Sequence, residues 1–297
     1  MKSKLLSVLS LAGICAGCGN GLSPTARTAT APSKGPAAHV ILIVEENHGY
    51  STVMYQNQMP WLKGLGDKYG VATNYYSDEK GSLLDYLWLS SGSSELRFGC
   101  NGNRCDYTIT DSNIFRELNK AGMSWNVYAD SLPEFGFMGM FAGNYAKRHD
   151  PAVWYSDVAN NPEQQENVVP FTQFPVDVAA GNLPDYSIVV PSLENDAHNG
   201  TPQMADQWLK TNIAPLLEGR YFQGKENNVM FITFDNGTKD EQGQVFTAVI
   251  GQRVIPGVKV NTPFKHENTL RTVMELLGLN RYPGASATAA PMNEFFK

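Results

Sequence analysis

The chain has 297 residues, of which 42% are hydrophobic and 18% charged, so it can bury a substantial core as one large domain or two small ones. Its formal net charge is −6, and a chain without a basic footprint is not typical of nucleic-acid-binding proteins. An acidic surface also argues against broad attraction to anionic membranes.

Residues 1–17 predict an export signal. Lys2 and Lys4 precede a short apolar stretch, and small residues then lead to Cys18, which is the layout of a secretory signal peptide. The segment resembles a bacterial lipoprotein signal with lipidation at Cys18, and cleavage by an ordinary signal peptidase nearby is the alternative. The apolar stretch is too short to favour a membrane-spanning helix. We therefore expect a periplasmic or cell-surface protein that meets the membrane only through a lipid at Cys18.

Residues 18–37 are rich in Ser, Thr, Ala, Pro and Gly and have almost nothing to bury. This composition predicts a flexible linker. The folded domain is then expected over residues 38–297, with a loose tail from Tyr282 that ends shortly before the C-terminus.

The first half of this domain begins with an apolar strand that runs through Val44. Three helices are expected after it: residues 59–70, residues 82–92 with Gly92 as the stop, and residues 112–122 with Ser112 as N-cap and Gly122 as the stop. A strand over residues 123–130 follows.

The second half continues the alternation. Its expected elements, in chain order, are a strand from residue 186, a helix over residues 202–217 that Pro215 could break, strands over residues 229–237 and 244–251, and a closing helix over residues 268–279. Buried strands interleaved with helices predict an α/β sandwich with a mainly parallel, helix-covered sheet.

Cys100 and Cys105 lie five residues apart after the signal segment is set aside. In an oxidising compartment such a pair predicts a small loop disulfide. Two cysteines alone would lack the ligands for a metal site.

Polar residues gather where three of the expected strands end: Glu45, Glu46, Asn47 and His48; Glu194, Asn195, Asp196 and His198; and Asp235 with Asn236. A parallel sheet brings these ends to one edge. Carboxylate and amide oxygens with imidazoles make a divalent-cation site plausible there, although any one cluster could be an ordinary turn or solvated loop.

Ser82 is the nucleophile candidate. The stretch SLLD also fits a capping box in which Ser82 caps the helix and Asp85 reaches back. The two interpretations are compatible, because a helix N-terminus favours an incoming phosphate and a nearby metal ion can activate a hydroxyl.

The spacing of the histidines does not decide their roles. His149 either packs or binds substrate. His266 is either functional or a residue that merely precedes a helix capped by Asn268.

In order along residues 39–279, the stretches IVEENHGY, GSLLDYLWLSSGS, NIFRELNKAGMSWNVYAD, RHDPAVWY, LPDYSIVVPSLENDAHNG, FITFDNG and HENTLRTVMELLGL resemble the bacterial phosphoesterase family of acid phosphatases and phospholipases C. The resemblance implies an alkaline-phosphatase-like three-layer α/β/α fold, a divalent metal ion of unknown identity and a phosphate-ester substrate. Carried over by motif, it implies Glu46, Asn47 and Asp235 as metal ligands, Ser82 as nucleophile, and Asp196, His198 and His266 as catalytic residues.

Two positions depart from that pattern. The family's HPSLPNY appears as KGSLLDY, so Lys80 stands where histidine is usual, and TWDE or TFDE appears as TFDN, so Asn236 replaces a carboxylate ligand. Lys80 could stabilise phosphate as a point charge, and an amide oxygen can still coordinate a hard cation. Two functions follow: a metal-dependent phosphoesterase that uses Ser82, or a lipid-anchored protein that binds phosphate esters or other ligands after losing efficient catalysis.

Overall fold

The structure, a computed structural model, describes residues 37–297 and contains an eight-stranded sheet with the order β10-β2-β9-β8-β1-β7-β3-β6. In chain order the strands are β1 (Val40–Glu45), β2 (Gly70–Ala72), β3 (Trp125–Ala129), β6 (Val168–Pro170), β7 (Tyr186–Val190), β8 (Val229–Phe234), β9 (Thr247–Gly251) and β10 (Val258–Val260). A separate hairpin joins β4 (Phe141–Ala142) to β5 (Tyr145–Ala146). The predicted signal peptide, most of the predicted linker and the lipidation at Cys18 lie outside the described residues.

β1 lies inside the sheet and pairs in parallel with β7 on one side and β8 on the other. All six of its residues are buried, as expected for a strand covered on both faces. β9 pairs antiparallel with both β8 and β2. The expected mainly parallel sheet is therefore confirmed, with the strand expected at residues 244–251 as its antiparallel member.

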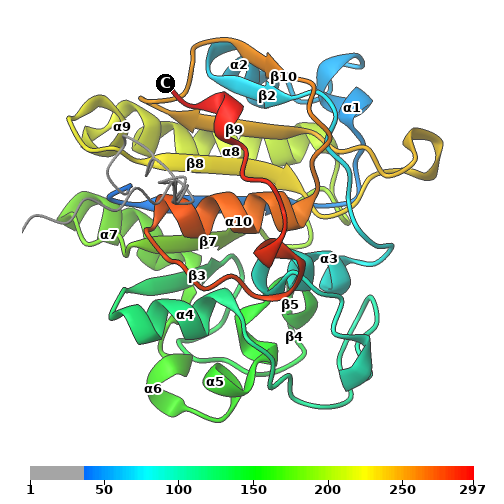
Figure 1. Cartoon of the computed structure of the whole chain (residues 1–297), viewed down its shortest axis with the longest axis vertical. Coiled ribbons are helices and arrows are strands. Elements are labelled where there is room, and N and C mark those ends of the chain that lie inside the picture. Colours follow the sequence, from blue (N-terminus) through cyan, green and yellow to red (C-terminus); the bar gives the residue numbers. More distant parts are fainter. Residues whose placement is uncertain (1–36) are drawn as a thin grey trace, which may run out of the picture. The chain divides into compact units, whose positions relative to one another are not determined.

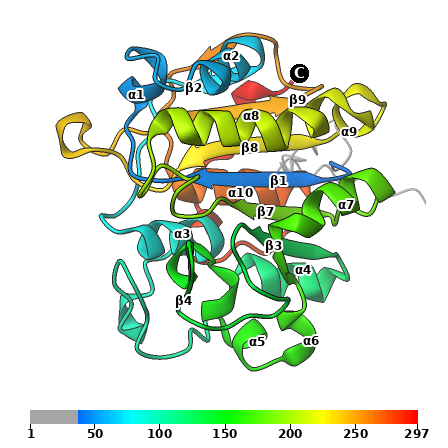
Figure 2. The same cartoon turned by 180° about the vertical axis from the view of Figure 1, so that it is seen from behind.

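Helices cover both faces of the sheet. α10 (His266–Leu276) lies across the face seen in Figure 1 and packs on α3 (Ser82–Ser91), whereas α8 (Pro202–Glu218) lies across the face seen in Figure 2. This is the three-layer α/β/α arrangement. The other helices are α1 (Tyr50–Met54), α2 (Pro60–Lys68), α4 (Ile114–Ala121), α5 (Ser156–Ala159), α6 (Pro162–Gln165), α7 (Phe174–Ala180) and α9 (Arg220–Gln223).

Two helix starts differ from the prediction. The N-cap of α4 is Asn113, not Ser112, and its side chain accepts a hydrogen bond from the third helical residue. Asn268 is not the N-cap of the closing helix, because α10 already begins at His266 after Lys265. Asn268 lies two residues further on, where its Oδ1 accepts the backbone N–H of Lys265 (2.8 Å). Ser and Asn cap equally well, so spacing alone did not locate the cap. α8 continues through Pro215 without ending there.

The C-terminal segment packs more closely than its composition predicted. Met292 and Phe295 are fully buried in the core. Among the described residues, no helix has the length and apolar character needed to cross a membrane.

Candidate active site

Three neighbouring parallel strands, β8, β1 and β7, bring the predicted polar residues to one edge of the sheet. The backbone N–H of Glu46 donates to the carbonyl of Asp196 (2.8 Å), and that of Asp235 donates to the carbonyl of Glu45 (2.9 Å). The expected convergence of these strand ends is confirmed. Carboxyl ends of parallel strands are where α/β proteins place their sites.

Ser82 is the first residue of α3, and its side chain is buried at the base of the site. Its hydroxyl donates a hydrogen bond of 2.7 Å to Glu46 Oε2. The predicted capping box is wrong, because Gly81 occupies the N-cap position and the Ser82 hydroxyl is directed at the carboxylate. The serine is thus oriented by a strand-end acid.

Asp85 does not reach back to cap α3 as predicted, but binds the loop that precedes the helix. Its Oδ1 accepts the backbone N–H groups of Asp78 (3.0 Å) and Glu79 (2.9 Å), so it holds the loop that leads into α3. Burial, followed by the charge of Asp235, raises the pKa of the Asp85 carboxyl to about 9. This carboxyl is therefore neutral at physiological pH in the folded, metal-free protein.

Oxygen-bearing side chains surround the Ser82–Glu46 pair. Asp235 Oδ1 accepts the backbone N–H groups of Asn47 (2.9 Å) and Asn236 (2.6 Å), while Asn47 Nδ2 donates to Glu46 Oε2 (3.0 Å). The amide of Asn236 donates its Nδ2–H to Asp235 Oδ2 (2.7 Å). The structure therefore brings together all four predicted metal ligands. Asn236 contacts Asp235 through its amide nitrogen, not through its oxygen.

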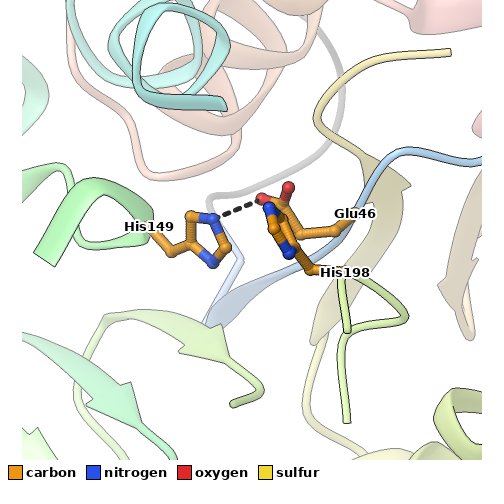
Figure 3. A group of neighbouring side chains, drawn as sticks. All are labelled: Glu46, His149 and His198. Atoms are coloured by element: carbon orange, nitrogen blue, oxygen red, sulfur yellow. Dashed lines mark ion pairs between the residues drawn. The ribbon is translucent and has the colours of Figure 1, made fainter. Parts of the chain in front are cut away.

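His149 lies on the other side of Glu46. Its Nε2 is 3.2 Å from Glu46 Oε1 and its Nδ1 is 3.1 Å from Asp196 Oδ2 (Figure 3 shows the contact with Glu46). The imidazole stacks on the ring of Tyr86 with centroids 5.5 Å apart and an interplanar angle of 9°. This buried histidine thus joins two of the strand-end acids.

The electrostatics of these buried groups share one cause. Burial, and then the charges of Asp235 and Asp196, raise the pKa of Glu46 well above its usual range. Burial raises the pKa of Asp196 to about 7 and, together with Arg148, lowers the pKa of His149 to about 3. Each shift shows that burial disfavours the charged form of the group.

A divalent cation fits this donor set. Glu46 Oε1 is buried without a hydrogen-bond donor, and an unpartnered buried carboxylate oxygen is costly unless a cation compensates it. The neighbouring carboxylates and amides of Asn47, Asp235 and Asn236 are oxygen donors of the kind that hard cations prefer. Both oxygens of Glu45 are also buried without a hydrogen-bond donor. Burial, and then the charges of Asp196 and Asp206, raise the pKa of Glu45 well above its usual range.

A cavity of about 1280 Å³ opens over Ser82. Four of its lining residues are basic or imidazole side chains suited to an anionic group: Lys80, Arg148, His198 and Lys239. Lys80 is exposed, and the described residues provide no ion-pair partner for it. Asp78 and Glu79 also line the cavity, so its walls are mixed in charge.

His198 and His266 occupy very different places. His198 lines the cavity, where its Nε2 lies 3.0 Å from Arg148 Nη2 and its backbone N–H donates to Asp196 Oδ1 (2.7 Å). His266 is fully buried, with Nε2 2.6 Å from the carbonyl of Asp235 and Nδ1 3.0 Å from the Tyr75 hydroxyl. Both nitrogens of His266 are therefore engaged behind the site.

The predicted disulfide between Cys100 and Cys105 is present. Residues 101–103 of its loop line the cavity. Gly102 packs so closely on Gly81 that a Cβ on Gly81 would lie 2.7 Å from the Gly102 Cα. The loop thus forms a wall immediately before the Ser82 helix.

Sequence reasoning left His149 undecided and did not propose Arg148, Lys239 or the disulfide loop. None of these comes directly after a strand that the sequence predicted: Arg148 and His149 come after β5, a two-residue strand of the separate hairpin. The search for polar residues at the ends of long apolar strands therefore could not find them. The only signal for His149 was the stretch RHDPAVWY, which counted as a family motif without a role.

The comparisons with known proteins agree with this geometry. The model of the Phosphoesterase family matches residues 45–280. The chain belongs to the phosphoesterase family. It is therefore an enzyme, a hydrolase that acts on phosphoric ester bonds.

Two curated relatives cover most of the chain. It is 28% identical to a phosphatidylinositol-3-phosphatase of Mycobacterium tuberculosis over 260 residues, covering 87% of this chain and 83% of that protein. It is 32% identical to a probable acid phosphatase of Kluyveromyces lactis over 259 residues, covering 82% of this chain but only 59% of the longer yeast protein.

Solved structures confirm the alkaline-phosphatase-like fold. A protein of the alkaline phosphatase superfamily from Vibrio parahaemolyticus superposes with a TM-score of 0.59 at 12% identity, covering 88% of this chain and 72% of that one. A phosphonate monoester hydrolase from Silicibacter pomeroyi superposes with a TM-score of 0.53 at 10% identity, covering 87% and 76%. At such identities the likeness concerns the fold alone.

Proposed function

We propose that this phosphoesterase cleaves phosphate esters with Ser82 as the nucleophile and with a divalent cation held by Glu46, Asn47, Asp235 and Asn236. The observation that carries the proposal is the 2.7 Å hydrogen bond from the Ser82 hydroxyl to Glu46 Oε2, made at the floor of an open cavity. When bound, the cation would supply positive charge at the reacting centre and favour the ionised form of the serine.

Side chains of the site would orient the nucleophile and stabilise the transferring phosphoryl group. Glu46 orients the Ser82 hydroxyl, whose oxygen would attack phosphorus as the ester oxygen leaves. Lys80, Arg148 and His198 line the cavity, where their donors can offset charge on the transferring phosphoryl group. Water would then release phosphate from the phosphoserine and return Ser82 to its starting state.

Substrate identity is part of the same proposal. The names of the two curated relatives both point to phosphate esters, and one of them specifies a phosphoinositide. A panel of p-nitrophenyl phosphate, bis-p-nitrophenyl phosphate and vesicles containing phosphatidylinositol 3-phosphate separates monoester, diester and lipid activity. Turnover of the first and third, with little of the second, is expected.

Substitution of the serine tests the mechanism. Ser82→Ala should lower p-nitrophenyl phosphate hydrolysis by at least about a thousandfold, because it removes the nucleophile. The matched control is Ser77→Ala, since Ser77 lines the same cavity but its hydroxyl donates to the carbonyl of Gly243. Undiminished hydrolysis by purified, folded Ser82→Ala would exclude the mechanism.

We also propose that export and lipid attachment at Cys18 place the enzyme at the periplasmic or outer cell surface. The support is the order of basic, apolar and small residues that precedes Cys18. Metabolic labelling with a palmitate analogue should mark the wild type and not Cys18→Ser. Labelling of both would contradict attachment at this cysteine.

A further inference from the structure

The cavity over Ser82 has unusual walls for its size. Its volume of about 1280 Å³ is larger than the roughly 300–1,000 Å³ of ordinary small-molecule pockets, so it has room for an alcohol as well as a phosphate group. Such pockets are usually lined mainly by hydrophobic and aromatic side chains. Among the described residues, those that line this cavity are glycines and polar or charged side chains, and the imidazole of His198 is the one aromatic ring.

Large apolar side chains are exposed elsewhere on the protein. Phe141 of β4 is 60% exposed, and Met204 of α8 is 42% exposed. In the described part of the chain, none of the exposed large hydrophobic side chains lines the cavity. An alcohol with an apolar body would therefore find no apolar wall beside the nucleophile, and its burial there would gain little from the hydrophobic effect.

Two loops supply side walls of the cavity. The disulfide loop contributes Asn101 and Asn103, and the loop between β8 and β9 contributes Thr238, Lys239 and Gln242. The two loops lie on opposite sides of α3 in both Figure 1 and Figure 2. A molecule that enters the cavity to reach Ser82 therefore passes between them.

The side chains of these walls have unused hydrogen-bonding groups. Asn103, Thr238 and Gln242 make no side-chain hydrogen bond to any other described residue, although all three line the cavity. An amide offers two donors and an acceptor, and a hydroxyl offers both functions. Hydroxyl groups of a ligand, which also donate and accept, match such walls.

Both walls are held in place by contacts within the protein. In the disulfide loop, Asn101 Oδ1 accepts the backbone N–H of Asn103 (2.9 Å). In the other loop, Glu241 Oε2 accepts the backbone N–H of Ser51 in α1 (2.9 Å). Because the walls are already formed, a ligand that binds between them loses less affinity to the ordering of loops.

We propose that the alcohol part of the substrate is a hydroxyl-rich body of sugar or polyol size, bound between the disulfide loop and the loop that follows β8. Its hydroxyls replace the water that hydrates the wall amides. An apolar alcohol of the same shape displaces this water without replacing the hydrogen bonds, which is costly. The inference rests on the proposed function for the cleavage step but not for binding of the alcohol.

Two phosphate monoesters with rings of the same size test the inference. Glucose 6-phosphate carries the hydroxyls, and cyclohexylmethyl phosphate lacks them. The wild type should favour glucose 6-phosphate by at least about tenfold in kcat/KM, the worth of one or two net hydrogen bonds, measured by release of inorganic phosphate. Equal kcat/KM values, or a preference for cyclohexylmethyl phosphate, would overturn the inference.

Variants of the walls locate the preference. Gln242→Met and Asn103→Leu keep the size of the side chain and remove its hydrogen-bonding groups, so each should reduce the preference about 2- to 10-fold. Gln203→Met is the matched control, because Gln203 is an exposed glutamine of α8 that does not line the cavity. It should keep the wild-type preference. An unchanged preference in both folded wall variants would also overturn the inference.

The hydroxyl-rich body can be free in solution or the headgroup of a lipid. Phosphatidylcholine vesicles that contain a diacylglycerol glucoside phosphorylated at its C6 oxygen are compared with free glucose 6-phosphate. Cleavage of either that falls in Gln242→Met supports the inference and identifies the source. Cleavage confined to the vesicles and unchanged in Gln242→Met would show that the lipid surface is recognised instead.

Binding separates this inference from the proposed function. Ser82→Ala, which the proposed mechanism leaves without a nucleophile, should still bind glucose 6-phosphate more tightly than cyclohexylmethyl phosphate in calorimetry. That preference, together with a wild type that cleaves neither ester, would support the inference and contradict the proposed function. Ser82-dependent cleavage of both esters without a preference would do the reverse.

Discussion

The buried carboxyl of Asp85 has hydrogen-bond donors for only one of its two oxygens. Its Oδ1 accepts two backbone N–H groups, while Oδ2 is buried without a donor. The family stretch HPSLPNY has asparagine where this chain has Asp85. An amide oxygen could accept the same two hydrogen bonds without a titratable charge.

Asp85→Asn should therefore raise the melting temperature of the metal-free protein at neutral pH. The pKa of Asp85 is about 9 in the folded state and about 3.9 in the unfolded chain, so unfolding releases a proton between these values and stability falls as pH rises. The gain should be small at pH 4 and reach several degrees by pH 8. A gain independent of pH, measured by thermal unfolding, would contradict the assigned titration.

Residue roles were the least predictable part of the site. Asp235, Glu46 and Ser82 were found because strand ends and a helix start are readable from sequence. The distances that make Glu46 contact both Ser82 and His149 depend on the packing of remote segments, which no spacing rule contains. The sequence left Ser82 compatible with both a nucleophile and an N-cap, and only the structure shows that Gly81 is the N-cap and that the Ser82 hydroxyl donates to Glu46.

At the scale of elements, the disulfide loop between Cys100 and Cys105 packs against the start of α3 and is hydrogen-bonded to it. Gly81 has a φ of 142°, which only glycine adopts readily, and it packs on Gly102 of the loop. The carbonyl of Gly102 accepts the N–H of Leu83 (3.3 Å). The loop therefore fixes the direction from which α3 presents Ser82.

Gly81→Ala should displace this start and lower kcat/KM about 10- to 100-fold, because small misplacements of a nucleophile are costly. Gly122→Ala is the matched control: Gly122 also has a positive φ of 69°, but it ends α4 with open space around it. The control should lose about 1 kcal/mol of stability and keep wild-type kinetics. Equal kinetics in the two variants would show that the Gly81–Gly102 contact does not position Ser82.

For the whole molecule, the alternating pattern predicted the fold class well because buried parallel strands are apolar along their full length. It could not predict strand order or the reversed direction of β9, since both depend on which strands meet after long connections. The tail also escaped prediction, because two apolar side chains in a polar segment, Met292 and Phe295, are enough to anchor it.

Metal removal should lower the melting temperature of the entire domain. An ion present at about 100 times its Kd adds about 2.7 kcal/mol, so chelation should shift the transition by roughly 5 to 10 °C. Glu46→Gln, which removes the charge of one proposed ligand, should make the transition insensitive to chelator. Glu194→Gln, at an exposed acid of the Asp196 loop, should retain the full shift. A wild-type transition that ignores chelator would contradict bound metal.

The place of β1 in the sheet has a kinetic consequence. Val40 pairs with Tyr186 on one side and Val229 on the other, so the first strand acquires its partners only after most of the chain is available. Contacts between such distant segments carry a large loop-closure cost and slow folding. During synthesis the earliest strand would wait unpaired while later segments emerge, and an unpaired apolar strand is prone to aggregate.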